Sequence, residues 1–275
     1  MKRILVILGT RPEAIKMCPL VNEMKARAGL RTIVCVTGQH RQMLDQVLDA
    51  FHVVPDYDLS IMKDKQTLFD ITTNILNRIK EVLEAVKPDV VLVHGDTSTT
   101  FVTALACFYL QIPVGHVEAG LRTYDKWSPF PEEMNRKMVG SIADLHFCPT
   151  VTNRDKLARE NITSGGFLTG NTVIDALKTT VRKDFTFETE ALNDLPYNEK
   201  KIILVTCHRR ENYGEPMKNI MLALRQIAEE DECGHLSAFQ LGYILDFDVY
   251  EGTSFGYSPS LDCLPNFRAQ GAYFD

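Results

Sequence analysis

The sequence predicts an α/β protein with a Rossmann-like parallel sheet, followed by the start of a second domain of the same kind. Two observations support this. Short runs that are apolar throughout alternate with longer segments whose apolar residues recur at the helical period. Strands without polar alternation are typical of a parallel sheet covered by helices on both faces. A polar segment at residues 184–200, which contains Pro196, then separates two stretches of this pattern.

The first stretch predicts a series of strands and helices in residues 1–183. Short runs rich in Val, Ile and Leu predict strands at residues 4–8, 32–36, 89–93, 113–117, 145–147 and 167–168. Helical periodicity predicts helices at residues 12–28, 41–51, 68–86, 99–109, 132–142, 151–160 and 173–181. Pro12 suits the first helical position, and Pro88 cannot continue the 68–86 helix.

The remainder of the chain divides into three segments. We interpret residues 184–200 as a linker, because they lack clear periodicity. A strand at 201–206 and a helix at 217–229 repeat the earlier pattern, so residues 201–230 are interpreted as the start of a second Rossmann-like domain. From residue 231 the helical period is lost and strand signals are weak, although glycines and aromatic residues are frequent. We expect residues 231–275 to form a poorly packed tail.

Composition excludes several classes of protein. The net charge is −6, from 30 basic and 36 acidic residues. This balance shows none of the excess positive charge that proteins use to bind nucleic acid or an anionic membrane. No apolar run approaches the roughly 18 residues of a membrane span, and the apolar run at residues 4–8 is too short for a signal peptide. The cysteines lack CxxC spacing, which favours a reducing cytoplasm without disulfides or a zinc site. They are Cys18, Cys35, Cys107, Cys148, Cys207, Cys233 and Cys263.

Cationic residues follow the first predicted strand. Ligands of parallel sheets bind at the carboxyl ends of the strands. Arg11 and Lys16 lie at the start of the next helix, whose N-terminus suits a phosphate group. The alternative interpretation is a capped helix with two exposed cations.

Three acids follow later strands and are candidates for acid–base chemistry. Asp96 follows the 89–93 strand, Glu118 follows the 113–117 strand, and Glu132 begins the next helix. Carboxylates gathered at one sheet edge can act as a general acid and a general base. Each acid alone is more often a helix cap or a surface charge. His208 ends the 201–206 strand and can titrate near neutral pH, although it also fits a surface cluster.

Seven blocks in order resemble the non-hydrolysing UDP-N-acetylglucosamine 2-epimerases over residues 1–230. They are Gly9-Thr10-Arg11-Pro12-Glu13-Ala14-Ile15-Lys16, Thr37-Gly38-Gln39-His40-Arg41, His94-Gly95-Asp96-Thr97, His116-Val117-Glu118-Ala119-Gly120-Leu121-Arg122-Thr123, Pro131-Glu132-Glu133-Met134-Asn135-Arg136, Thr169-Gly170-Asn171-Thr172-Val173-Ile174-Asp175 and His208-Arg209-Arg210-Glu211.

The resemblance implies a two-domain fold similar to B-type glycosyltransferases. It implies interconversion of UDP-GlcNAc and UDP-ManNAc, without NAD or metal, through loss of the C2 proton, departure of UDP and its re-addition to 2-acetamidoglucal. By motif, the resemblance assigns catalysis to Asp96, Glu118, Glu132 and His208, substrate binding to Arg11, Lys16 and Arg136, and a regulatory UDP-GlcNAc site to Gln39, His40 and Gln42. It further implies a homodimer that serves cell-surface polysaccharide synthesis.

The second half of the chain departs from this family. Only about 30 residues after the linker keep the family register, whereas a Rossmann-like domain needs roughly 100–150. The later Asp-Ser-Gly-Gly and Glu-Glu blocks are missing. We therefore expect little or no epimerase activity from this chain. Two alternatives stay open: a hydrolysing epimerase that releases UDP and ManNAc, which the Gln39-His40-Arg41 block disfavours, and an inactive UDP-sugar-binding module.

Overall fold

The chain divides into two compact units, Met1–Lys183 and Asp184–Asp275. The computed structural model describes residues 1–38, 41–61, 66–182, 184–187, 190–195, 197–199, 203–206, 214–230, 236–240 and 243–247. In this part of the chain, no helix is long and apolar enough to cross a membrane.

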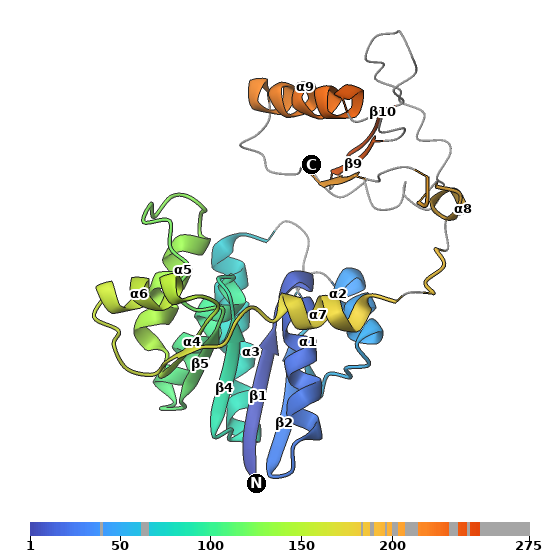
Figure 1. Cartoon of the computed structure of the whole chain (residues 1–275). Helices are drawn as coiled ribbons and strands as arrows, with labels where there is room; N and C mark the ends of the chain where they lie inside the picture. Colours follow the sequence, from blue (N-terminus) through green and yellow to red (C-terminus); the bar gives the residue numbers. More distant parts are fainter. Residues whose placement is uncertain are drawn as a thin grey trace. The chain divides into compact units, whose positions relative to one another are not determined.

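The first unit is built on a sheet whose described strands run in the order β3-β2-β1-β4-β5-β6-β7. Figure 1 shows the central strands β2, β1, β4 and β5 side by side. Every neighbouring pair is parallel, which confirms the predicted fold class. The strands are β1 (Lys2–Leu8), β2 (Leu30–Val36), β3 (Tyr57–Asp58), β4 (Val90–His94), β5 (Val114–Val117), β6 (Leu145–Cys148) and β7 (Gly166–Leu168). The sequence did not predict β3, because two residues are too few to form a pattern.

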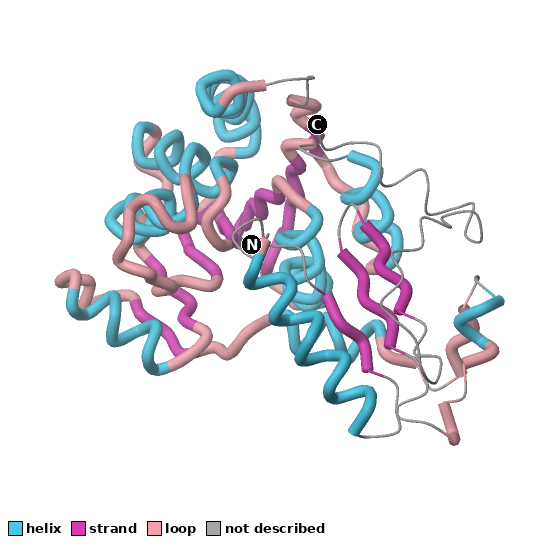
Figure 2. The backbone as a smooth tube through the Cα atoms, turned by 90° about the horizontal axis from the view of Figure 1, so that it is seen from above, coloured by secondary structure: helices cyan, strands magenta, loops and turns pink. Residues whose placement is uncertain are grey.

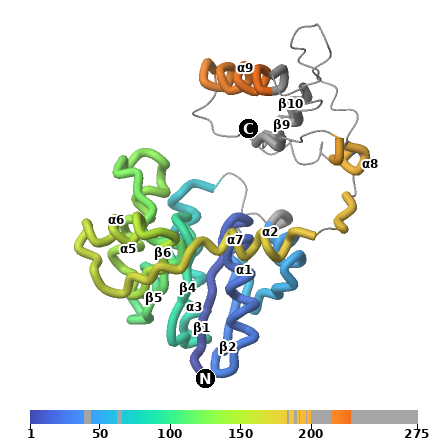
Figure 3. Tube along the Cα trace, in the orientation of Figure 1, coloured from blue at the N-terminus to red at the C-terminus, as the bar shows by residue number. Residues whose placement is uncertain are grey.

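Helices cover both faces of this sheet (Figure 2). They are α1 (Arg11–Ala26), α2 (Arg41–Ala50), α3 (Leu68–Val86), α4 (Ser98–Tyr109), α5 (Glu132–Ile142), α6 (Val151–Arg159) and α7 (Val173–Thr180). Successive side chains of β1 point to opposite faces of the sheet, as the pleat of a strand requires. Leu5 and Ile7 join the core under α3 and α4. Val6 and Leu8 join the core under α1 and α2. Helix α7 packs against α1 (Figure 3).

The ends of the helices follow from local chemistry. At the start of α3, Asp70 N donates to Thr67 Oγ1 and Thr67 N donates to Asp70 Oδ2, which forms a capping box. Lys87 ends α3 with a φ of +48°, and Pro88 follows it. Thr97 caps α4 by accepting from Thr100 N. The turn between β4 and α4 therefore has a fixed geometry.

The four cysteines of the first unit are buried thiols. They are Cys18, Cys35, Cys107 and Cys148. Burial raises the pKa of the first three to about 12 and also raises the pKa of Cys148. These thiols act as small apolar side chains: Cys35 and Cys107 in the core under α3 and α4, Cys18 in the core under α1 and α2, and Cys148 in a smaller cluster with Ala119 and Leu157.

The second unit holds a small sheet with the strand order β10-β9-β8. Its described elements are α8 (Glu190–Asn193), β8 (Ile203–Thr206), α9 (Glu215–Glu230), β9 (Leu236–Gln240) and β10 (Tyr243–Phe247). Strand β9 pairs parallel to β8, and β10 pairs antiparallel to β9.

The structure adds detail to this region. The segment interpreted as a linker contains the short helix α8, and the segment expected to form a tail contributes β9 and β10, of which β9 pairs with β8. Backbone pairing satisfies N–H and C=O groups whatever the side-chain period, so weak periodicity did not exclude strands here. The poor packing expected of residues 231–275 stays a prediction, because the side chains of these residues lie outside the part of the chain that the structure describes.

Two glycines separate the cost of a left-handed backbone from the cost of a steric clash. Gly120 has a φ of +86°, and a Cβ there would lie 2.2 Å from Asn153 O. Gly29 has a φ of +91°, with nothing within 4 Å of such a Cβ. We expect Gly29→Ala to lower the free energy of unfolding by about 1–2 kcal/mol, and Gly120→Ala by roughly 1–3 kcal/mol more. Urea unfolding of both variants measures this, and equal losses would contradict it.

Candidate active site

The carboxyl edge of the sheet places several turns side by side. Strands β1 and β4 are neighbours, but the strands that follow them in sequence lie on opposite sides of this pair. The order therefore reverses between β1 and β4, and parallel sheets bind ligands at such a switch point. The turn after β1 leads into α1, which begins at Arg11 and includes Lys16. The turn after β4 carries Asp96, and Glu118 follows β5.

Buried Glu13 joins the turn after β1 to the turn after β4. Its Oε2 accepts from the backbone N–H groups of Gly9 and Thr10, both at 2.6 Å. Its Oε1 accepts from the hydroxyls of Thr97 at 2.6 Å and Thr100 at 3.2 Å. Burial raises the pKa of Glu13, and these hydrogen bonds oppose that shift. The N–H groups of Gly9 and Thr10 are therefore already used, so an anion at this helix start would depend on the cationic side chains.

Lys16 and Glu118 form an ion pair at this edge, with 2.6 Å between Nζ and Oε1. Asn171 Nδ2 donates to the same carboxylate oxygen at 3.2 Å. His94 Nε2 lies 3.6 Å from the other oxygen, Oε2. Glu118 itself has a φ of +64°, an uncommon conformation for a residue with a side chain. Residues held in such strained conformations cluster at functional sites.

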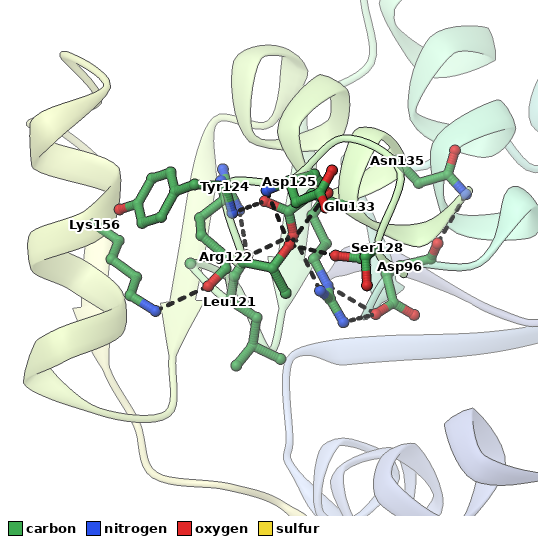
Figure 4. Close-up of polar contacts among 12 residues, drawn as sticks. Asp96, Leu121, Arg122, Tyr124, Asp125, Ser128, Glu133, Asn135 and Lys156 are labelled. Atoms are coloured by element: carbon green, nitrogen blue, oxygen red, sulfur yellow. Dashed lines mark hydrogen bonds and ion pairs between the residues drawn. The ribbon is translucent and has the colours of Figure 1, made fainter. Parts of the chain in front are cut away.

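Asp96 is held by α5 (Figure 4). Arg136 donates from Nε to Asp96 Oδ2 at 2.8 Å, and its Nη2 lies 2.6 Å from the same oxygen. Asn135 Nδ2 donates to the backbone oxygen of Asp96 at 2.8 Å. Lys16 and Arg136 thus neutralise different acids, so Glu118 and Asp96 each have a cationic partner.

Glu133 occupies the first turn of α5, next to Asp96 and Arg136. Its two oxygens accept from the backbone N–H groups of Thr123 and Tyr124, both at 3.0 Å. Arg136 Nη1 donates to Glu133 Oε2 at 3.2 Å. Burial alone would raise the pKa of Glu133, but these hydrogen bonds outweigh burial and the net shift is downward.

Not all residues predicted for the site can be placed. Glu132 begins α5 at the same edge, is partly buried, and makes no ion pair within the described residues. Arg11 begins α1 and lines an apolar pocket with residues of α2 and α7. Gln39, His40 and His208 lie outside the described residues, as does the side chain of Gln42.

The sequence analysis missed four polar residues that support the site. Glu13, His94, Glu133 and Asn171 were quoted within motifs, but none was assigned a role. Asn171 could have been found, because it follows β7 at the carboxyl edge. Glu13 and Glu133 lie in first helical turns, where an acid is normally interpreted as a cap.

Two buried histidines at this edge stay neutral. Burial lowers the pKa of His94 to about 3, and the charge of Lys16 adds to this effect. Burial also lowers the pKa of His116 to about 3. His116 Nε2 lies 2.7 Å from Gly95 O, so this nitrogen carries the proton and donates.

Comparison with known proteins matches most of the chain to one family. A family model described as UDP-N-acetylglucosamine 2-epimerase matches residues 22–237. The chain is 58% identical over 231 residues to the UDP-N-acetylglucosamine 2-epimerase of Bacillus subtilis, covering 84% of this chain and 60% of that protein. It is 53% identical over 232 residues to the enzyme of that name from Escherichia coli O157:H7, covering 82% and 62%. These matches confirm the resemblance predicted from the sequence.

Solved structures give the same result. The UDP-GlcNAc 2-epimerase of Neisseria meningitidis, bound to UDP-GlcNAc, matches with a TM-score of 0.77 and 46% identity over 86% of this chain and 66% of that chain. The S. aureus MnaA–UDP complex matches with a TM-score of 0.78 and 50% identity over 88% and 64%. The chain spans about 60% of the length of the first curated relatives that it matches.

We expect the free energy of unfolding to fall as the pH falls below 6.5, because the unfolded chain then binds protons that buried His116 does not. With a folded pKa of about 3, this histidine alone costs about 2 kcal/mol between pH 7.5 and pH 5. His116→Gln, which can still donate to Gly95 O, should remove that part of the pH dependence. Urea unfolding at the two pH values measures it, with exposed His52→Asn as the control. An unchanged pH dependence in His116→Gln would contradict the expectation.

Proposed function

Because this chain belongs to the UDP-N-acetylglucosamine 2-epimerase family, we propose that the carboxyl edge of its first unit interconverts UDP-GlcNAc and UDP-ManNAc. The observation that carries this proposal is the pairing of two acids with two cations at the switch point of the sheet. Lys16 pairs with Glu118, and Arg136 pairs with Asp96. Inversion at C2 needs a proton removed from one face of the sugar and delivered to the other, so it needs more than one acid–base group.

The proposed substrate-binding groups are cations. Arg11 and Lys16 lie at the start and second turn of α1, next to the switch point where parallel sheets bind phosphorylated ligands. Because Glu13 accepts from the turn's N–H groups, we assign the first unit's share of the diphosphate contact to these two side chains. Arg136 is assigned to the sugar side of the site, because it contacts Asp96.

The proposed reaction is an elimination followed by an addition. A carboxylate removes the C2 proton, the C–H electron pair forms the C1–C2 double bond, and the C1–O bond breaks with its electrons passing to UDP. UDP oxygen then adds to C1 of the resulting 2-acetamidoglucal, while C2 accepts a proton on the opposite face. A positioned base is essential because the C2 proton is only weakly acidic. Asp96, Glu118 and Glu132 are the proposed acid–base groups.

Glu132 differs from the other two acids in a way that suits proton transfer. Within the described residues it has no ion pair, so it can change charge without losing a salt bridge. Glu118 and Asp96 each lose an ion pair when protonated. His208 is proposed to act on the nucleotide side of the site.

Further expectations belong to the same proposal. UDP-GlcNAc is proposed as an effector at Gln39, His40 and Gln42 as well as the substrate, and the protein is proposed to act as a cytoplasmic homodimer. An inactive UDP-sugar-binding module is the second candidate, favoured by the chain's length of about 60% of its relatives. Isothermal titration with UDP-GlcNAc beside a turnover assay separates the two, since a module binds without turnover.

We expect Asp96→Asn to slow replacement of the C2 proton by deuterium about 10²-fold or more, as for other acid–base groups. Proton NMR of UDP-GlcNAc incubated with enzyme in D₂O measures this rate. The assay is run in this chain and, with the equivalent substitution, in a full-length relative. Asp155→Asn, an exposed acid on α6, is the matched control. Near-normal exchange in the Asp96 variant of both proteins would contradict an acid–base role for Asp96 and leave it only a structural role at the start of α4.

We also expect this 275-residue chain to turn over UDP-GlcNAc at least about 10²-fold more slowly than a full-length relative, because the later Asp-Ser-Gly-Gly and Glu-Glu blocks, which the resemblance links to the uridine and diphosphate site, are missing from it. Coupled detection of UDP-ManNAc under identical conditions compares the two proteins. Equal turnover would contradict this expectation and would place all the essential groups within this chain.

A further inference from the structure

We propose that Glu133 is a positioning residue for the epimerisation: it turns the guanidinium of Arg136 so that Arg136 holds Asp96 by one oxygen and leaves the other free for the sugar. The proposal rests on the role proposed above for Asp96. It concerns a residue adjacent to Glu132 for which the sequence motifs assigned no function.

The contacts of Arg136 are divided between two acids, Asp96 and Glu133. Its Nε and Nη2 both approach Asp96 Oδ2, at 2.8 and 2.6 Å. Its Nη1 donates to Glu133 Oε2 at 3.2 Å. An arginine paired with a single carboxylate usually forks onto both oxygens. Here Oδ1 of Asp96 takes no hydrogen bond within the described residues, so it can accept or deliver a proton while Oδ2 stays fixed.

Glu133 can orient Arg136 because Glu133 is itself fixed. Its side chain is only 4% exposed. The backbone N–H groups of Thr123 and Tyr124 hold its two oxygens at 3.0 Å each. These donors belong to the main chain and do not change rotamer. The same hydrogen bonds lower its pKa despite burial, so its negative charge for Arg136 persists through the neutral range.

The donors that hold Glu133 lie on a segment with its own anchors. Arg122, adjacent to Thr123, forks onto Glu160 at 2.9 and 2.8 Å. Thr123 Oγ1 donates to Ser128 O, which closes the segment on itself. The direction of Arg136 therefore depends on this hydrogen-bonded segment as well as on α5. Misplacement of a catalytic group by about 1 Å can cost 10²-fold in rate, so this orientation has a measurable consequence.

A purely structural role is the competing explanation. In that case Glu133 would only fix the Thr123–Tyr124 turn, and its loss would lower stability without changing the environment of Arg136. Glu133→Gln separates the two roles. Glutamine keeps the shape and one backbone acceptor, but removes the charge that attracts Nη1 of Arg136.

The first measurement does not need turnover. In ¹⁵N-labelled protein, we expect the Nη1–H signals of Arg136 to be protected from solvent exchange in the wild type and to lose protection at least about tenfold in Glu133→Gln, since Nη1 then loses its charged acceptor. Exposed Glu81→Gln on α3 is the control and should leave the signal unchanged. An unchanged Arg136 signal in a folded Glu133→Gln protein would overturn the proposal. Because this readout uses no substrate, it stays decisive even if the chain shows no epimerisation.

The second measurement uses the C2 exchange assay. We expect Glu133→Gln to lower kcat about 10- to 100-fold while KM changes less than about threefold, since positioning affects the reacting geometry more than binding. Arg136→Lys tests the same link if Glu133→Gln fails to fold, because lysine cannot hold both acids with a fixed fork. The double variant should lose no more than the worse single variant. Additive losses, or equal changes in kcat and KM, would overturn the proposal.

Discussion

The parallel pairing of β1 with β4 at the centre of the sheet determines where chemistry can occur in this protein. The chain moves outward in opposite directions from this pair, so the turns after the two strands meet at one edge with no helix crossing between them. The buried carboxylate of Glu13 joins these two turns by accepting hydrogen bonds from two backbone N–H groups of the first and two hydroxyls that follow β4. Gly9 permits this close approach, since a Cβ there would lie 2.4 Å from Thr99 Oγ1.

Most of the fold was predictable because its signal is local. Apolar runs and helical periods identify the strands and helices of the first unit, and the parallel order follows from their alternation. The same logic placed Asp96, Glu118 and Lys16 at one edge, since each follows a strand. Strand β3 escaped prediction because it is too short to show a period. Strands β9 and β10 escaped because backbone pairing stabilises a strand without clear alternation.

The pairing within the site could not be predicted. Lys16 and Glu118 are 102 residues apart, and no local pattern indicates that they meet. Likewise, the division of Arg136 between Asp96 and Glu133 depends on the path of the segment around Thr123. Sequence motifs identify which residue types are present at an edge. The partner of each charge is decided by tertiary geometry, and that partner determines which oxygen of a carboxylate stays available.

The left-handed backbone of Glu118 has a consequence for the evolution of this protein. A residue with a side chain at a φ of +64° gives up about 1–2 kcal/mol that glycine would retain. Glycine at this position would remove that conformational cost, but it would also remove the carboxylate that pairs with Lys16 and accepts from Asn171. The acid is therefore kept against the local preference of the backbone, and its own contacts help to offset the cost of keeping it there. A lineage that no longer needed the carboxylate would lose both the strain and the contacts in a single substitution.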